Sequence, residues 1–348
     1  MGVNYKPWHI NYNDFYSLKY TADKLRFLLK FAVLAPSTHN SQPWKFIISD
    51  SGVLVVPELG RTLPVTDPEY RLLCISLGCT VENLLIAADY YNYQTKVEYF
   101  PHEAEEITIR ISLQENSPRT KSKKNHLIFA IPERRTNRSK YSPTAPKKEA
   151  LSQLENFVID AAAIRLATDS KKQKDIADIL LESRLKAFDN KLFRKELAHY
   201  KRTNLTKSPL GMPGFTMGLN TPLSLITPFA IRHINVIRFL KKQEEKLLKK
   251  YTPVFGFVIT TGDSKIDWVA AGRLFEHVVL EAECLNIQTA ISAISPRTHK
   301  QLQEILDTPH FPQVFFRMGY ATEIPKHSPR LSAEKVSIQK FNSSQYGK

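Results

Sequence analysis

Two long helical segments of this sequence repeat each other, and the repetition constrains the fold more than any other feature. Residues 72–91 read as a helix that is apolar almost all round, and residues 268–285 as a second long helix. Six residues recur at one offset of 194 residues. The identical pairs are Gly78 and Gly272, Glu82 and Glu276, Ala88 and Ala282, Asn92 and Asn286, Gln94 and Gln288, and Thr95 and Thr289. The register indicates an internal duplication; two unrelated core helices with accidental identities are the alternative.

The ends of the helices carry their own signals. Residues 21–33 have an apolar stripe with helical spacing, for which Thr21 is the expected N-cap and Pro36 the expected stop. Asp267 is the expected cap of the second long helix. Asn92 and Asn286 are suited to the left-handed residue that closes a helix.

Strands precede the long helices in both halves, over residues 44–49 and 254–261. These patterns predict an α+β fold of two tandem repeats that form a pseudo-dimer in one chain. We expect repeat 1 over residues 1–125, repeat 2 over residues 126–330 and a mobile tail over residues 331–348. The basic segment 117–125 joins the repeats in this prediction.

Composition narrows the class of protein. The 348 residues, 42% of them hydrophobic, are enough for a full core, and no signal peptide or membrane span is evident. The three cysteines, an odd number without C-x-x-C spacing, predict buried free thiols in a reducing, cytoplasmic compartment, and no metal site. The net charge of +15 raises nucleic acid, an anionic membrane or an acidic ligand as partners. Because the charge is spread thinly, a solvated surface is the favoured explanation.

Two polar motifs stand out, one in each half. The first is A-P-S-T-H-N-S-Q-P-W at residues 35–44, and the second is R-R-T-N-R at residues 134–138. Each half lacks the motif of the other, so the two predict one shared site between the halves. The planar guanidinium groups of an arginine pair suit a phosphate, while prolines fix the ends of the polar loop. An ordinary helix stop and turn is the alternative for the loop alone.

Together with the helix from Trp268 and the ending P-Q-V followed by R-M-G-Y at residues 312–320, these motifs resemble the nitroreductase superfamily. The two-repeat chain is similar to its Acg-type branch, over about residues 21–330. The resemblance implies bound FMN, with R-x-[ST]-x-R on the phosphate, the P-S-x-x-N loop at the flavin ring, and no catalytic side chain or metal. The implied cofactor-binding residues are Arg134, Arg135, Thr136, Arg138, Pro36, Ser37, Thr38, Asn40, Gln42, Ser292, Ala293 and Arg330.

The resemblance further implies an oxidoreductase that passes electrons from NAD(P)H through FMN to a nitroaromatic or quinone-type acceptor. The alternative is an FMN store with little reductase activity, in which the Gly- and Pro-containing segment 192–226 is a lid or else a plain connection. Residues 225–242, L-I-T-P-F-A-I-R-H-I-N-V-I-R-F-L-K-K, suggest a third function at a nucleic acid or membrane surface, although their apolar residues would equally suit the core. We expect no nucleic-acid partner, no integral membrane association, and a monomer or weak dimer.

Overall fold

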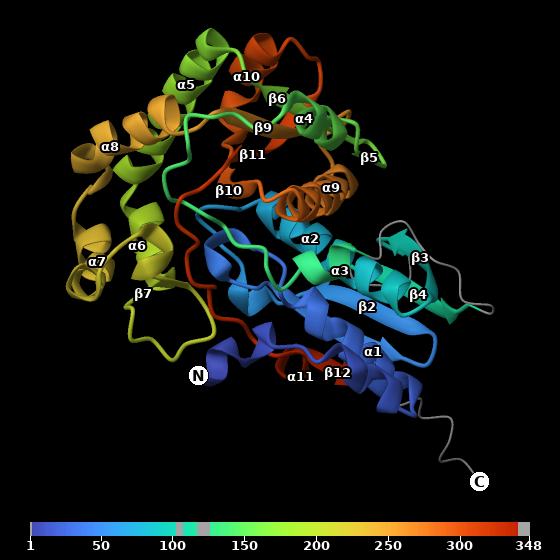
Figure 1. Ribbon diagram of the computed structural model, residues 1–348. Helices are drawn as coiled ribbons and strands as arrows, with labels where there is room; N and C mark the ends of the chain where they lie inside the picture. Colours follow the sequence, from blue (N-terminus) through green and yellow to red (C-terminus); the bar gives the residue numbers. More distant parts are fainter. Residues whose placement is uncertain (1, 102–106, 117–125, 340–348) are drawn as a thin grey trace.

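The computed structural model describes residues 2–101, 107–116 and 126–339. Two five-stranded sheets lie on either side of a central pair of helices, α2 and α9 (Figure 1). The first sheet has the order β12-β1-β2-β4-β3 and the second the order β10-β11-β9-β6-β5. Each sheet therefore consists mainly of strands from one half of the chain, as a duplicated α+β fold requires.

The elements have the following bounds. The strands are β1 Trp44–Ser49, β2 Gly52–Pro57, β3 Tyr93–Tyr99, β4 Ile109–Glu115, β5 Val158–Ile159, β6 Ala162–Ala167, β7 Lys201–Arg202, β8 Met212–Pro213, β9 Val254–Thr260, β10 Gln288–Ala293, β11 Phe311–Gly319 and β12 Ser337–Gln339. The α-helices are α1 Thr21–Ala32, α2 Arg71–Tyr90, α3 Leu127–Ala130, α4 Lys148–Glu155, α5 Ser170–Asp189, α6 Lys191–Tyr200, α7 Thr221–His233, α8 Ile237–Lys250, α9 Lys265–Cys284, α10 His299–Leu306 and α11 Ala333–Val336. The 3-10 helices are η1 Val3–Trp8, η2 Tyr12–Ser17, η3 Thr38–Asn40, η4 Leu59–Arg61, η5 Gly214–Met217 and η6 Pro296–Thr298.

The two repeat-related glycines lie where α2 crosses α9. A Cβ atom added to Gly78 would lie 2.1 Å from the carbonyl oxygen of Val269, and one added to Gly272 would lie 2.0 Å from that of Ile75. Both distances are far inside van der Waals contact, so the helices approach this closely only because neither position has a side chain. The two halves of the chain therefore meet at a helix crossing where each contributes the same duplicated glycine.

We therefore expect Gly272→Ala to destabilise the protein by about 1 to 3 kcal/mol. Alanine would gain about 1 kcal/mol over glycine in a free helix, but here its methyl group forces the helices apart. Chemical denaturation measures the change. The control is Gly60→Ala, because the nearest atom to an added Cβ there is Glu58 Oε1 at 3.4 Å. Equal stability of Gly272→Ala and the unaltered protein would contradict the close crossing.

Most predicted elements are confirmed, but two helix caps are wrong. Thr21 is the first residue of α1, whose N-cap is Tyr20 without a side-chain hydrogen bond. Helix α9 starts at Lys265 with Ser264 as N-cap, and Asp267 completes a capping box from the first turn. The apolar periodicity missed this turn because it lies partly in solvent. Asn92 and Asn286 do adopt left-handed conformations, with φ of 66° and 58°.

The predicted mobile tail is also partly wrong. Residues 333–336 form α11, and β12 pairs in parallel with β1, which places the end of the chain in the sheet of the first half. A strand of three residues is too short to show alternation in a sequence. The predicted connection at residues 117–125 and the tail beyond residue 339 lie outside the described residues.

Helix α2 is the one described helix long and apolar enough to cross a membrane, and 89% of its most apolar window is buried inside the fold. It is therefore a core helix, as its all-round apolar pattern indicates. Cys74 and Cys79 are buried in this helix. Cys284 is free but exposed at the end of α9, so the prediction that all three cysteines are buried is wrong for Cys284.

Candidate functional site

The polar loop after α1, residues 36–42, has an unusual backbone. His39, Asn40 and Gln42 all have positive φ, of 56°, 55° and 51°, a conformation that costs residues other than glycine free energy. The Ser37 hydroxyl accepts a hydrogen bond from the Gln42 backbone N–H at 2.9 Å. Trp44, fully buried, fixes the chain where β1 begins. The surrounding structure thus holds the loop in a shape that local sequence preferences alone would not select.

The amide side chains of the loop bind two other segments of the chain. Asn40 Nδ2 donates to the carbonyl oxygens of Gly211 and Pro329, both at 2.9 Å. Gln42 Nε2 donates to Pro209 O at 2.7 Å, and Gln42 Oε1 accepts from the Leu331 backbone N–H at 2.9 Å. We expected the Asn40 amide to face the flavin ring. The structure instead engages it with the insert (residues 201–220, between α6 and α7) and the C-terminal strap (residues 325–331).

The R-R-T-N-R motif runs beside the start of β10. Thr136 forms an isolated parallel bridge with Thr289, and the Asn137 backbone N–H donates to Thr289 O at 2.8 Å. The Asn137 side chain is fully buried and donates to Glu323 O at 2.7 Å. The motif is therefore fixed to the second sheet through Thr289, one of the duplicated residues.

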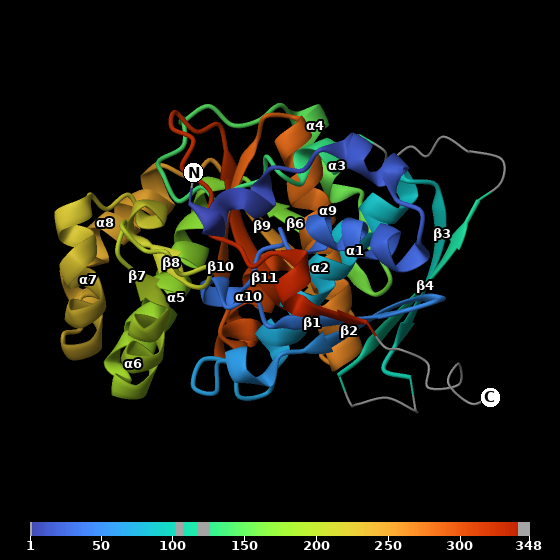
Figure 2. The ribbon, with the colours of Figure 1, turned by 90° about the horizontal axis from the view of Figure 1, so that it is seen from below.

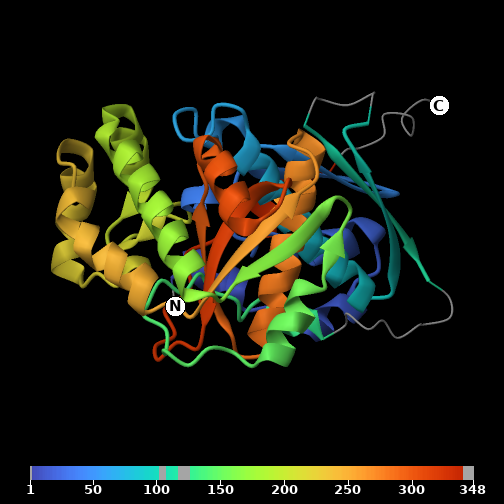
Figure 3. The same cartoon turned by 90° about the horizontal axis from the view of Figure 1, so that it is seen from above.

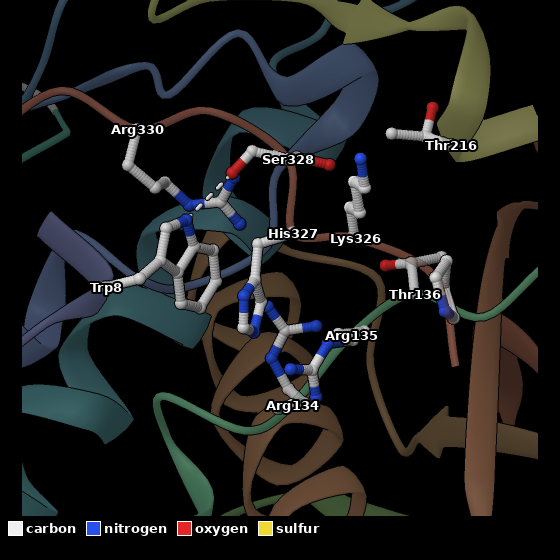
Figure 4. Close-up of a pocket in the computed structure, with 10 residues that line it drawn as sticks. Trp8, Arg134, Arg135, Thr136, Thr216, Lys326, His327, Ser328 and Arg330 are labelled. Atoms are coloured by element: carbon white, nitrogen blue, oxygen red, sulfur yellow. Dashed lines mark hydrogen bonds between the residues drawn. The ribbon is translucent and has the colours of Figure 1, made fainter. Parts of the chain in front are cut away.

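The first two arginines of the motif and Thr136 line a small pocket between the halves (Figure 4). We call it the anion pocket. Its lining residues are Trp8, Arg134, Arg135, Thr136, Thr216, Pro325, Lys326, His327, Ser328 and Arg330. The structure thus gathers four of the predicted site residues, Arg134, Arg135, Thr136 and Arg330, around one space.

Arg134 and Arg330 also contact the polar loop and the helix before it. Each donates an Nη2 hydrogen bond to the carbonyl oxygen of Leu34 at 3.2 Å. Arg330 Nη1 donates to Asn40 Oδ1 at 2.6 Å. Leu34 and Asn40 belong to the first half, and the two arginines to the second. The two sequence motifs therefore meet at this carbonyl group.

The anion pocket contains more positive than negative charge. Glu276 is fully buried beside Arg134, with Oε1 3.3 Å from Arg134 Nε, and burial raises the pKa of this carboxyl to about 7. Burial, with the charge of Arg134 second, lowers the pKa of Arg330 to about 9. Burial and then the arginines also lower the pKa of His327 to about 3. The neighbouring arginines contribute to both shifts after burial, and an anion would offset this repulsion between positive charges.

The donors in the pocket fit a phosphate group. Arg330 Nε is buried and has no hydrogen-bond partner within the described residues. A buried donor without a partner costs free energy, which a ligand oxygen would recover. Arg135, Thr136 and Lys326 add polar groups at the same lining. The donor set therefore suits a phosphate monoester better than an apolar ligand.

Trp8 is a pocket residue that the sequence did not reveal. Its ring stacks on His327, with centroids 4.0 Å apart, and its Nε1 donates to Ser328 O at 2.8 Å. The guanidinium of Arg330 also lies over the Trp8 ring, 4.9 Å from the ring centroid. Trp8 is 320 residues from Ser328 along the chain, and no pattern in the sequence links the two. Thr216 of the insert was missed for the same reason.

The third arginine of the motif lies elsewhere. Arg138 belongs to a second cationic cluster with Arg184, Lys201 and Arg317. Arg138 does not line the anion pocket, and its expected role at the phosphate stays a prediction. Burial, followed by the positive charges of Lys201 and Arg138, lowers the pKa of His39 in the polar loop to about 3.

Lys201 is an unusual member of this cluster. It is only 9% exposed, and its Nζ lies 2.7 Å from the thioether sulfur of Met217. Burial, then Arg138 and Arg184, lowers its pKa to about 7. Arg184 pairs with Glu244 and donates to Ser292 Oγ at 2.9 Å. The predicted site residue Ser292 therefore belongs to the second cluster, while Ala293 is exposed where β10 ends.

The remaining predicted site residues frame the loop. Pro36 is buried, and Ser37 and Thr38 are half-buried. The predicted lid, residues 192–226, includes most of α6 and the first turns of α7, so its irregular part is the insert of residues 201–220. The insert lies against the loop through Pro209 and Gly211, and supplies Thr216 to the anion pocket.

Fold and site together define a two-repeat α+β protein with an anion pocket between its halves. No family model matches the chain. The chain is similar to acg of Mycobacterium tuberculosis, provisionally named an NAD(P)H nitroreductase, with 24% identity over 332 residues, 91% of this chain and 96% of acg. Another M. tuberculosis protein with that provisional activity is 33% identical over 122 residues, which span only 35% of the length of each protein. Along its length the chain is thus similar to acg, a protein named for the nitroreductases.

Solved structures include weaker likenesses. The FMN-dependent nitroreductase NfnB from Mycobacterium smegmatis, in complex with NADPH, aligns with a TM-score of 0.38 and 12% identity over 63% of this chain and 95% of that chain. An FMN-dependent nitroreductase from Clostridium difficile aligns with a TM-score of 0.35 and 14% identity over 60% of this chain and 96% of that chain.

Proposed function

We propose that the chain is an FMN-dependent oxidoreductase that takes electrons from NAD(P)H. The observation that carries the proposal is the meeting of the two motifs: Arg134 and Arg330 bind Leu34 O, and Arg330 binds Asn40, beside a pocket with surplus positive charge. The resemblance of the motifs to the nitroreductase superfamily and the similarity to acg along its length support the choice of FMN over other phosphate esters.

The side chains of the anion pocket would hold the phosphate of the cofactor. Arg134 and Arg330 supply charged donors, Thr136 a neutral hydroxyl, and Trp8 with His327 covers the pocket wall. Hydrogen bonds to a charged group contribute about 1.5 to 3 kcal/mol each, so these donors alone offset only part of the association cost of about 4 to 15 kcal/mol. The rest of the affinity must come from burial of the flavin ring.

When bound, FMN would supply the redox chemistry, and the chain would orient the reactants and exclude water. The second cationic cluster lies near the polar loop through Lys201 and His39, and contacts β10 through Arg184 and Ser292. The positive charges of Arg138 and Lys201 there would favour ligands that carry or gain negative charge. No side chain is required as an acid or base in this proposal, and the ring of the half-buried His39, whose pKa is lowered to about 3, is neutral.

The second candidate function is an FMN store, and the contacts between the insert and the polar loop support it. Pro209 and Gly211 of the insert are hydrogen-bonded to Gln42 and Asn40 of the loop. A cover held by these bonds would restrict access of NAD(P)H and of an acceptor. A nitroaromatic or quinone-type acceptor, a cytoplasmic location and a monomeric or weakly dimeric state complete the proposal for the enzyme.

Anaerobic mixing of the FMN-loaded protein with NADPH or NADH separates the two candidates. Loss of the flavin absorbance within seconds supports the enzyme, and colour that persists supports the store. The variant Gln42→Leu, which removes the bond to Pro209, should accelerate bleaching if the insert limits access. Protein that is colourless after purification and takes up no added FMN would overturn both candidates.

A further inference from the structure

Exposed apolar side chains gather on helices α7 and α8. Eighteen large hydrophobic side chains are exposed among the described residues, and seven of them lie within residues 221–250. Phe239 is 81% exposed and Phe229 68% exposed. The seven are Leu223, Leu225, Ile226, Phe229, Ile234, Phe239 and Leu240. The sequence left open whether this segment packs into the core, and the structure places these side chains in solvent.

Helical spacing collects these residues on definite faces. In α7, Leu225, Ile226 and Phe229 are three and four residues apart and share one face, while Ser224 and Ile231 are buried on the other. In α8, Lys242 and Lys246 follow Phe239 by three and seven residues, on the same exposed face. An apolar ring beside lysines is the arrangement by which helices bind the interface of a membrane.

The two helices form one edge of the molecule. Figures 1, 2 and 3 place α7 and α8 at the side opposite the β3–β4 hairpin, outside both sheets. The axes of α7 and α8 differ by 114°, and at 13 and 14 residues each helix is shorter than the roughly 20 residues that a membrane span needs. The pair can therefore lie on a membrane, but neither helix can cross one.

The charge of this edge identifies the partner. Residues 221–250 contain seven Lys and Arg residues and two Glu, a net charge of +5. Both carboxylates are engaged, Glu244 with Arg184 and Glu245 with Lys249 at 3.0 Å. We propose that α7 and α8 dock this protein peripherally on an anionic lipid membrane. The phenylalanines enter the interface, and the lysines of α8 bind the headgroups.

Two other partners fit this edge less well. A second copy of the chain on a two-fold axis would bring the cationic faces of α8 together, and like charges oppose such an interface. Nucleic acid would engage the lysines, but its phosphate backbone offers no apolar surface for Leu225 and Ile226. A lipid surface is the one partner that uses both the charge and the aliphatic side chains.

Co-sedimentation with vesicles tests the proposal on the full-length, FMN-loaded protein. We expect binding to phosphatidylcholine vesicles that contain phosphatidylglycerol, and much weaker binding to phosphatidylcholine alone. Phe229→Ser and Phe239→Ser should each weaken binding about tenfold, and Lys242→Gln and Lys246→Gln about fivefold each. High salt should remove most of the part of the vesicle affinity that comes from the lysines.

Phe129→Ser is the matched control, because Phe129 is 52% exposed but lies in α3, away from this edge. It should bind the anionic vesicles like the unaltered protein. Equal binding to both kinds of vesicle, or unchanged binding after the loss of both phenylalanines, would overturn the proposal. So would a dimer that forms through this edge, detected by light scattering, without any affinity for vesicles.

Discussion

Replacing Arg330 by alanine is expected to abolish most of the preference of this protein for FMN over riboflavin. Arg330 lines the anion pocket, and its Nε atom has no hydrogen-bond partner in the described part of the chain. FMN and riboflavin differ only in the phosphate, so the ratio of their dissociation constants isolates the contribution of the pocket. Loss of one charged donor at about 1.5 to 3 kcal/mol corresponds to roughly 10- to 150-fold weaker FMN binding.

Riboflavin also separates phosphate binding from damage to the loop. Arg330 also donates hydrogen bonds to Asn40 and to Leu34 O, so we expect Arg330→Ala to disturb the ring site and weaken the binding of both flavins. Only the loss of a phosphate contact weakens FMN more than riboflavin. Fluorescence titration measures both constants, and Arg297→Ala, at an exposed arginine, is the control. An unchanged ratio in Arg330→Ala would place the phosphate somewhere other than the anion pocket.

The same titration distinguishes the arginines of the R-x-T-x-R motif. Arg134 lines the anion pocket, whereas Arg138 belongs to the second cationic cluster with Lys201 and Arg317. Arg138→Ala should therefore weaken FMN and riboflavin to a similar extent. The sequence alone treated the two arginines as equivalent phosphate ligands, since a motif gives spacing but not the direction of each side chain.

The sequence revealed the parts of the site that depend on local pattern. Helical periodicity located α2, and the constant offset linked Gly78 to Gly272, which the structure places face to face. Asn92 and Asn286 could be predicted as left-handed because few residue types tolerate that conformation. These features follow from preferences of single residues or of a single helix face.

The parts that the sequence did not reveal depend on contacts between distant segments. Trp8 reaches the pocket by stacking on His327, and Asn40 is engaged by Gly211 and Pro329. Neither contact leaves a periodic trace, because each consists of one side chain meeting an irregular segment. For a related reason the sequence did not decide whether the apolar side chains of residues 225–242 are buried or exposed. An apolar stripe does not indicate whether another element of the fold covers it.

The duplicated glutamates show how far the halves have diverged. Glu82 pairs with Arg273 at 3.1 Å and contacts His277 at 3.0 Å, both within the central helix pair. Glu276 instead pairs with Arg134 beside the anion pocket. The same residue at the same place in each repeat is thus structural in one half and part of a candidate binding site in the other.

Replacing Arg134 by methionine is expected to destabilise the FMN-free protein at alkaline pH, by about 1.4 kcal/mol for each unit by which the loss of this cation raises the pKa of Glu276 further. The change leaves Glu276 fully buried without its cation, and an unpaired buried charge is the costliest outcome of breaking an ion pair. The double variant Arg134→Met with Glu276→Gln should regain most of this stability, because no charge then remains at the position. Chemical denaturation of the four proteins gives the coupling between the two residues.

The pH dependence of this cycle follows from the pKa of Glu276, which burial raises from 4.5 to about 7. A carboxyl with a raised pKa in the folded state contributes stability at pH values below 4.5, and this contribution is lost as the pH rises through about 7. The unaltered protein should therefore lose up to about 3 kcal/mol relative to Glu276→Gln across this range. The penalty in Arg134→Met should shrink at pH 5, where Glu276 is protonated. Equal penalties at pH 5 and pH 8 would show that the buried carboxylate is not the cause.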